Sequence, residues 1–259
     1  MTDWQDYKYK AFISYSHSDE KWARWLHRSL ENYRVPKRLV GRQTDMGKVP
    51  ARLAPVFRDR EELASATDLG AKLTEALESS AVQIVICSMA SAKSHWVNEE
   101  IKAFKRLGRS DRIFSLIVDG EPYASGQEGI DHYECFPPAL RFKLGEDGEL
   151  SDEPAEPIAA DARHGKDGKA NARVKLLAGL LGLGFDDLRQ RELQRRNRRL
   201  AVISGSAVVG MLVAIGLATT AVIARNEAEL QRNRAETEAE TARQTASFLV
   251  SLFEVSDPS

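Results

Sequence analysis

The amino-acid sequence predicts an α/β fold, a doubly wound parallel sheet of five strands, followed by a single transmembrane helix. Over residues 8–118, short apolar runs of strand length alternate with helical patterns. This order is typical of parallel sheets with helices on both faces. The run VQIVICS (82–88) is almost wholly apolar, as strands in the middle of such sheets are. Residues 200–224 contain no charged residue, proline, asparagine or glutamine, which indicates a membrane span.

The first strand and the first helix are expected before residue 36. KAFISYS (10–16) is a short apolar run that ends in a polar cluster, which predicts a strand followed by a loop. EKWARWLHRSLENY (20–33) then has helical spacing, and Pro36 ends the helix. The side chains at helical spacing are Trp22, Trp25, Leu26, Ser29, Leu30 and Tyr33.

The second strand and helix follow. RLAPVF (52–57) predicts a strand, and its proline favours a place at the sheet edge or at the start of the strand. DLGAKLTEALESS (68–80) places Leu69, Leu73 and Leu77 four residues apart, which predicts a helix with Asp68 as its N-cap.

Three further strands complete the expected sheet. VQIVICS is followed by a helical segment, SAKSHWVNEEIKAF (91–104), and by RIFSLIVDG (112–120) as the fourth strand. EPIAA (156–160) is expected to close the sheet as the fifth, and FPPALRFKL (136–144) to form a short strand. Ligands of such sheets bind outside the carboxyl ends of the strands. Those ends are Tyr15–Ser16, Arg58–Asp59, Cys87–Ser88 and Asp119–Gly120.

Composition excludes several functions. The net charge of −1 argues against a nucleic-acid partner. Two cysteines, Cys87 and Cys135, are too few for a disulfide framework, and Cys87 lies in an apolar run as a buried thiol would. The five histidines have no metal-ligand spacing, so no metal site is expected.

The membrane span is predicted from its length. As a helix, the 25 residues 200–224 extend ~37 Å, more than a hydrocarbon core of ~30 Å. The alternative is a buried core helix, but such helices rarely lack a polar face for so long. Six arginines within 189–199, against three arginines and two glutamates within 225–235, place residues 1–199 in the cytoplasm.

Four segments follow from these patterns. They are an α/β domain (1–185), a basic juxtamembrane helix (186–199), the transmembrane helix (200–224) and a charged extracytoplasmic helical tail (225–259).

Three motifs occur in order within the α/β segment: YKAFISYSHSDE (9–20), LAPVFRDREEL (53–63) and SAKSHWVNEEI (91–101). They resemble the first box, the second strand with its loop, and the third box of the Toll/interleukin-1 receptor (TIR) family. The first box alone is weakly specific, whereas three in order are strongly specific. The resemblance covers residues 8 to about 185 and is to bacterial TIR proteins with a membrane helix. It implies the flavodoxin-like TIR fold for this segment.

In family members that cleave NAD⁺, the glutamate in the position of Glu100 is the catalytic carboxylate. Helical geometry supports this assignment. Val97, Ile101 and Phe104 form the expected core stripe, and Trp96 and Glu100 are expected to flank the cleft beside it. Glu99 points ~100° away from Glu100 and is placed to pair with Lys102.

The other expected NAD⁺-binding residues lie at the strand ends and in the third box. Trp96 would offer a flat wall for stacking, Ser88 and Ser94 would offer hydrogen bonds, and Arg58 would bind a phosphate. Tyr15 and Ser16 would line the same cleft. Asp59 belongs to this set, although Arg58 and Asp59 alternatively pair with each other in a solvated loop.

Two functions remain open on the sequence. One is a signalling enzyme that takes NAD⁺ as substrate, without a cofactor or metal, and is active when copies cluster. In the family, the loop from Arg58 to Ala66 of one copy reaches the next. The other is a non-catalytic adaptor that recruits TIR proteins. The expected partners are other TIR domains including its own copies, NAD⁺ and a membrane. A phosphoacceptor receiver domain is excluded, because its third strand ends in aspartate and this one ends Cys87–Ser88.

Overall fold

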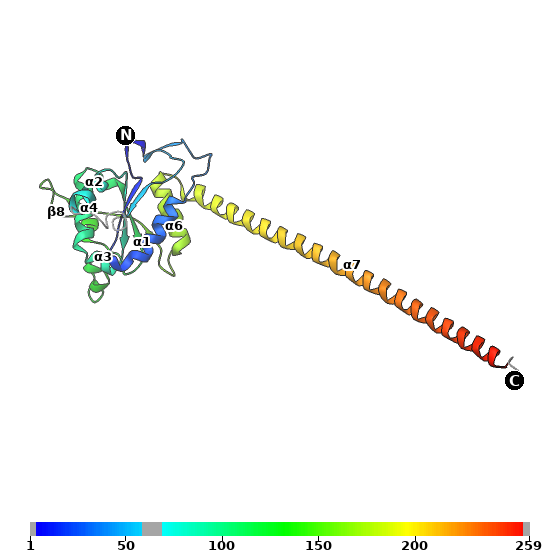
Figure 1. Cartoon of the computed structure of the whole chain (residues 1–259). Helices are drawn as coiled ribbons and strands as arrows, with labels where there is room; N and C mark the ends of the chain where they lie inside the picture. The colour runs from blue at the N-terminus through cyan, green and yellow to red at the C-terminus, as the bar shows by residue number, and fades with distance from the viewer. Residues whose placement is uncertain (1–3, 59–68, 256–259) are drawn as a thin grey trace. The chain divides into compact units, whose positions relative to one another are not determined.

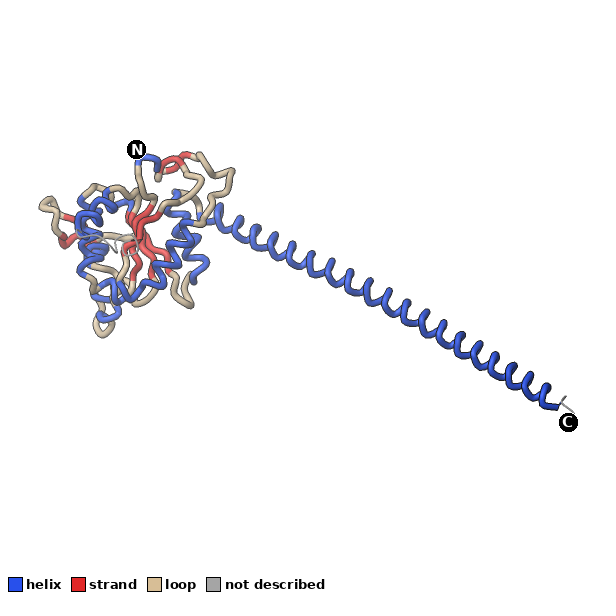
Figure 2. The backbone as a smooth tube through the Cα atoms, in the orientation of Figure 1, coloured by secondary structure: helices blue, strands red, loops and turns tan. Residues whose placement is uncertain are grey.

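The computed structural model describes residues 4–58 and 69–255. The chain divides into two compact units, Met1–Glu192 and Leu193–Ser259, each described here by itself. In the first unit, helices lie on both faces of one central sheet (Figures 1 and 2). This is the predicted α/β fold.

The central sheet has five parallel strands in the order β4-β1-β5-β6-β9. They are β1 (Ala11–Ser14), β4 (Val56–Arg58), β5 (Gln83–Cys87), β6 (Ile113–Ile117) and β9 (Ile158–Asp161). The order confirms the doubly wound sheet, with the proline-preceded strand at one edge and the strand in EPIAA closing the other. After β1 the chain forms β4 on one side of β1, and it then crosses to form β5 on the other side. The topological switch point of the sheet is therefore at β1.

Two layers of helix cover the sheet (Figure 1). On one face, α1 (Glu20–Glu31) and α6 (Gly168–Leu181) pack into one hydrophobic cluster with the sheet. On the other face, α2 (Leu69–Glu78) and α4 (His95–Arg106) pack into a second cluster. Side chains such as Leu26 of α1 are fully buried, which stabilises the fold by roughly 1.5–3 kcal/mol for each such side chain.

The other elements described before residue 185 are short. They include the helices α3 (Met89–Ala92) and α5 (Pro138–Arg141), and 3₁₀ turns at Trp4–Asp6, His17–Asp19, Ser110–Arg112, Ala124–Gly126 and Asp131–Tyr133. Two small hairpins pair β2 (Gln43–Thr44) with β3 (Gly47–Lys48) and β7 (Phe142–Leu144) with β8 (Leu150–Pro154).

The segment FPPALRFKL differs in part from its prediction. Its prolines open the helical turn α5 instead of a strand, because a proline fits the first turn of a helix, where its missing N–H has no partner to lose. Only its end, β7, is a strand, and β7 lies outside the main sheet.

Gly182 ends α6 in the left-handed conformation, with φ 60°. An added Cβ would clash with the Asp45 carboxylate and lie 2.8 Å from the Thr44 hydroxyl oxygen, which itself donates to the Leu181 carbonyl (3.0 Å). We therefore expect Gly182→Ala to lower the free energy of unfolding by about 2–3 kcal/mol. Chemical denaturation measures this difference. Gly126→Ala, where nothing lies within 4 Å of the new methyl group, is the control and should change stability by less than about 0.5 kcal/mol.

The second unit consists of the greater part of the helix α7 (Phe185–Val255). Among the described residues, the stretch Gly210–Ser247 is long and apolar enough to cross a membrane, judged by length and composition alone. Its large apolar side chains between Met211 and Ile223 are 52–66% exposed. It overlaps the predicted span at residues 200–224. The orientation of this helix in a membrane stays a prediction.

Candidate functional site

The candidate site lies at the carboxyl edge of the sheet. Because the five strands are parallel, the residues that follow them meet at one edge. Tyr15 follows β1, Ser88 follows β5 and Asp119 comes two residues after β6, while Arg58 is the last residue of β4. The described residues at the predicted strand ends therefore lie along the same edge of the sheet.

Glu100 lies on the buried side of α4, with 6% of its surface exposed. The helix begins after Ser94, whose hydroxyl oxygen accepts a hydrogen bond from the Val97 amide (3.3 Å). Val97, Ile101 and Phe104 are buried in the core, which confirms the predicted core stripe. Glu100 therefore does not face bulk water, and keeping its carboxylate in this position costs desolvation free energy.

The neighbouring glutamate faces outward. Glu99 forms an ion pair with Lys102 at 3.3 Å, and Lys102 also bridges to Glu149 at 2.6 Å. The predicted pairing of Glu99 with Lys102 is confirmed. Two adjacent glutamates thus occupy different environments, because one residue of helix turns a side chain by ~100°.

Trp96 is open to solvent, with 71% of its surface exposed. Its ring lies edge-on to that of His95, with the centroids 6.0 Å apart. Trp96 and Glu100 are four residues apart on α4, but only Glu100 is covered by the protein. Stacking of the Trp96 indole on a ligand stays a prediction. Such a ligand would cover the exposed surface of the Trp96 side chain.

Ser88 is buried and forms the N-cap of α3. Its hydroxyl donates to Asp19 Oδ2 (2.6 Å) and accepts from the amides of Ala90 and Ser91. The Ser88 proton is therefore already engaged within the protein. Ser88 joins the end of β5 to the loop after β1, in addition to any contact with a ligand.

Asp19, which sequence reasoning did not single out, is the acceptor in this contact and is 7% exposed. The pKa of the Asp19 carboxyl is raised, mainly because the group is buried. The hydrogen bond from Ser88 lowers this pKa, and the charge of Asp119 raises it. The carboxyl edge of the sheet thus holds two acidic side chains, Asp19 and Asp119, close enough to interact electrostatically.

Asp19→Asn is expected to remove the loss of stability that accompanies deprotonation of Asp19 as the pH rises. A raised pKa means that native Asp19 binds its proton more tightly than the unfolded chain does. Its contribution to stability therefore falls as the pH rises from the ordinary aspartate range through the raised pKa. Asparagine keeps an acceptor for Ser88 and removes this titration. Melting temperatures measured across this pH range test the expectation, with the exposed Asp111→Asn as control; identical pH profiles for Asp19→Asn and wild type would contradict it.

Arg58 is 3% exposed and stands beside Ile13 in the register of β4 with β1. The alternative that Arg58 lies in a solvated loop is wrong, because β4 extends through Arg58 and buries it. Tyr15 is also buried, and the Ser16 carbonyl accepts from the Asp19 amide (2.8 Å). Asp59, with the following loop as far as Ala66 and the expected N-cap Asp68, lies outside the described residues.

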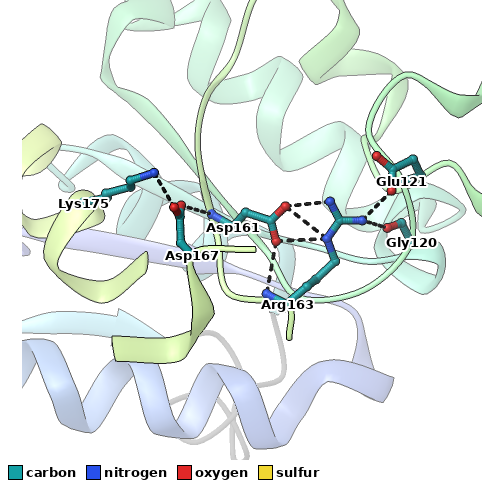
Figure 3. A network of polar contacts seen from close by, with 6 residues as sticks. All are labelled: Gly120, Glu121, Asp161, Arg163, Asp167 and Lys175. Carbon is teal, nitrogen blue, oxygen red and sulfur yellow. Dashed lines mark hydrogen bonds and ion pairs between the residues drawn. The ribbon is translucent and has the colours of Figure 1, made fainter. Parts of the chain in front are cut away.

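An ionic network joins the ends of β6 and β9 (Figure 3). The Arg163 guanidinium binds the Asp161 carboxylate (2.6 Å), the Glu121 carboxylate (2.7 Å) and the Gly120 carbonyl. Beside it, the Asp167 carboxylate accepts from the Asp161 amide (3.4 Å). Bidentate arginine contacts of this kind have a fixed geometry, so the network holds the loop after β6 against the last strand.

Glu134 fixes the same loop from within and is 8% exposed. Its carboxylate accepts from the Tyr123 amide (3.2 Å), the Phe136 amide (2.8 Å), and both the amide (3.1 Å) and hydroxyl (2.7 Å) of Ser125. Arg141 lies 4.0 Å away. The segment between residues 121 and 136 is thus held by side-chain contacts with the backbone more than by regular secondary structure.

Comparison with known proteins identifies the family. A family model described as the TIR domain matches residues 11–138, which include the first four sheet strands and the buried Glu100. The chain contains a TIR domain. It is 32% identical over 251 residues to a curated protein of an Actinoplanes species named "NAD(+) hydrolase ApTIR", an alignment that covers 91% of this chain and 33% of that protein. The chain therefore spans about a third of the length of this relative.

A solved structure, the TIR domains of the activated Roq1 resistosome in the complex that recognises the effector XopQ, also matches. Its sequence identity with this chain is 18% and its TM-score is 0.35. The match covers 48% of this chain and 66% of that one.

The TIR domain thus holds the buried side chain of Glu100 on α4, and the parallel strands place a set of polar residues at the carboxyl edge of the sheet. Within residues 4–58 and 69–255, no three histidine, cysteine or acidic side chains gather as a metal site would require. In its ionised form, a carboxylate in a protein interior interacts with other charges more strongly than one in water.

Proposed function

We propose that this protein is a membrane-anchored TIR-domain signalling protein that cleaves NAD⁺ to nicotinamide and ADP-ribose products when its copies associate. The observation that carries the proposal is the burial of Glu100 on α4, at 6% exposure. The similarity to a curated NAD(+) hydrolase along 91% of the chain supports it.

The chemistry requires one carboxylate. Nicotinamide in NAD⁺ is a cationic leaving group and departs neutral, so no general acid is needed. Positive charge develops on the ribose, as in the oxocarbenium-like transition state of glycoside hydrolysis. A buried carboxylate stabilises this charge through space, and Glu100 supplies it. In this proposal Arg58 binds a phosphate of NAD⁺, and Tyr15, Ser16, Ser88, Ser94 and Asp59 complete the polar lining.

Self-association fits a tethered protein. The apolar stretch of α7 could hold the chain in a bilayer, and confinement to a membrane raises the effective concentration of neighbouring copies. The arginines before this stretch favour a cytoplasmic TIR domain, where NAD⁺ is available. Weak contacts between TIR domains then become sufficient for assembly.

Full-length protein reconstituted in liposomes at increasing surface density tests this proposal. We expect the NAD⁺ consumption per molecule to rise with density, because association completes the site. Released nicotinamide, measured by chromatography, gives the rate. A rate per molecule that does not change with density would contradict the role of association.

A non-catalytic adaptor is the second candidate, and the exposed Trp96 favours it. Tryptophan is enriched at protein interfaces, where it buries a large area on binding. If wild-type protein consumes no NAD⁺ at any density but binds a second TIR domain through the surface around Trp96, the adaptor function is correct.

A further inference from the structure

A groove of about 710 Å³ is lined by residues of α1 and α6. These two helices cover the sheet face opposite α4 (Figure 1). Its lining includes the five basic side chains Lys21, Arg24, Arg28, Lys169 and Arg173, together with Trp25. None of the described residues that line it is acidic.

This concentration of charge is not a result of composition, because the whole chain has a net charge of −1. Arg24 pairs with Glu20 one turn away at 2.5 Å, but both side chains are partly exposed, at 47% and 39%, so the pair is weak. A concave surface lined by charges of one sign raises the local concentration of the opposite ion. The groove therefore attracts anions.

One of these cations is held in place by aromatic rings. The Lys169 ammonium lies 4.5 Å from the ring centroids of both Trp22 and Trp25, whose planes meet at 88°. Such cation–π contacts restrict a side chain that is otherwise flexible. Lys169 is thus positioned at the groove before a ligand arrives, which lowers the entropy cost of binding.

We propose that this groove binds a ligand with two or more linked phosphate groups, either a soluble polyphosphate or nucleotide or the headgroup of an anionic phospholipid that itself has at least two phosphates. One arginine guanidinium group can donate two parallel hydrogen bonds to the oxygens of a phosphate. The groove has such a group on each helix, Arg28 on α1 and Arg173 on α6. A second copy of the chain is a poor occupant, because a two-fold axis through the groove would set cations against cations. The site is on the other face of the sheet from Glu100 and does not depend on the proposed NAD⁺ cleavage.

Titration with inorganic tripolyphosphate tests the soluble source. Full-length protein in phosphatidylcholine nanodiscs is expected to bind it saturably in calorimetry, with an affinity that falls as salt rises. The double variant Arg28→Glu/Lys169→Glu should weaken binding by about tenfold or more. The control Lys37→Glu/Arg38→Glu makes the same change in charge at exposed residues outside the groove and should weaken binding by less than about twofold.

Hydrogen exchange tests the lipid source. Protein reconstituted in phosphatidylcholine vesicles is compared with protein in vesicles that also contain cardiolipin, an anionic phospholipid whose headgroup has two linked phosphate groups. If the ligand is a headgroup, the anionic lipid slows amide exchange in α1 and α6 of wild type and of the control, but not of the groove variant.

Circular dichroism establishes that the variants fold. If Arg28→Glu/Lys169→Glu does not fold, Lys21→Gln/Arg28→Gln replaces it, because both side chains are exposed on α1. Binding in either arm that requires the groove cations supports the proposal. The absence of binding in both arms, or an equal loss in the control variant, would overturn it.

Discussion

Glu100→Gln is expected to lower NAD⁺ consumption by densely reconstituted protein about a thousandfold or more. Glutamine keeps the size of the side chain and removes its charge, so the variant loses the electrostatic stabilisation of the ribose cation in the transition state. A thousandfold loss corresponds to about 4 kcal/mol. Nicotinamide release by wild type and variant at equal liposome density measures the effect.

Glu99→Gln is the matched control for this experiment. Glu99 is adjacent to Glu100 on α4, and replacing it with glutamine removes the same charge. Its carboxylate, however, pairs with Lys102 at the surface. We expect this variant to keep activity within about threefold of wild type, because surface ion pairs contribute little. Equal losses in the two variants would mean that the charge of this helix end matters in general and that Glu100 has no specific role.

Glu134→Ala is expected to cause the largest loss of stability, roughly 2–4 kcal/mol. Alanine leaves the amides of Tyr123, Ser125 and Phe136 without their carboxylate acceptor, and buried donors without a partner are costly. Denaturant unfolding of the full chain, followed by the signal of the TIR domain, measures the change. Glu128→Ala, at an exposed position in the same segment, should change stability by less than about 0.5 kcal/mol.

The effect of Glu134 also depends on pH. Burial raises the pKa of its carboxyl, but hydrogen bonds from Ser125 and from the Phe136 amide, with the charge of Arg141, outweigh burial and leave the pKa lowered. A lowered acid pKa stabilises the fold above the ordinary glutamate range, and this stabilisation is lost as the pH falls through the lowered value. The difference between wild type and Glu134→Ala should therefore shrink in acid. A difference that stays constant with pH would contradict this assignment.

The sheet could be predicted because its signal is local. Each strand is a short apolar run, and even β9 is visible in EPIAA at residues 156–160. The loop between residues 121 and 136 could not be predicted in the same way. Its path depends on Glu134 and on residues with positive φ, Gly120 and Tyr123, and none of these leaves a periodic pattern.

The candidate site was predictable in part for the same reason. The core stripe of Val97, Ile101 and Phe104 follows from their spacing, but the spacing does not distinguish the buried Glu100 from the exposed Trp96 on the neighbouring stripe. The contact of Asp19 with Ser88 joins residues 69 positions apart, so no local spacing indicates it. The sequence indicates only that Asp19 follows the first strand and that Ser88 follows the third. Both residues are therefore expected at the same edge of the sheet, but their contact is not.

A structure of the assembled full-length protein with a non-cleavable carbocyclic analogue of NAD⁺ tests the central claim most directly. We expect the Glu100 carboxylate to lie within about 3 Å of a hydroxyl group on the ring that replaces the nicotinamide ribose. An analogue bound elsewhere, for example in the basic groove between α1 and α6 with Glu100 in contact with protein alone, would contradict the account.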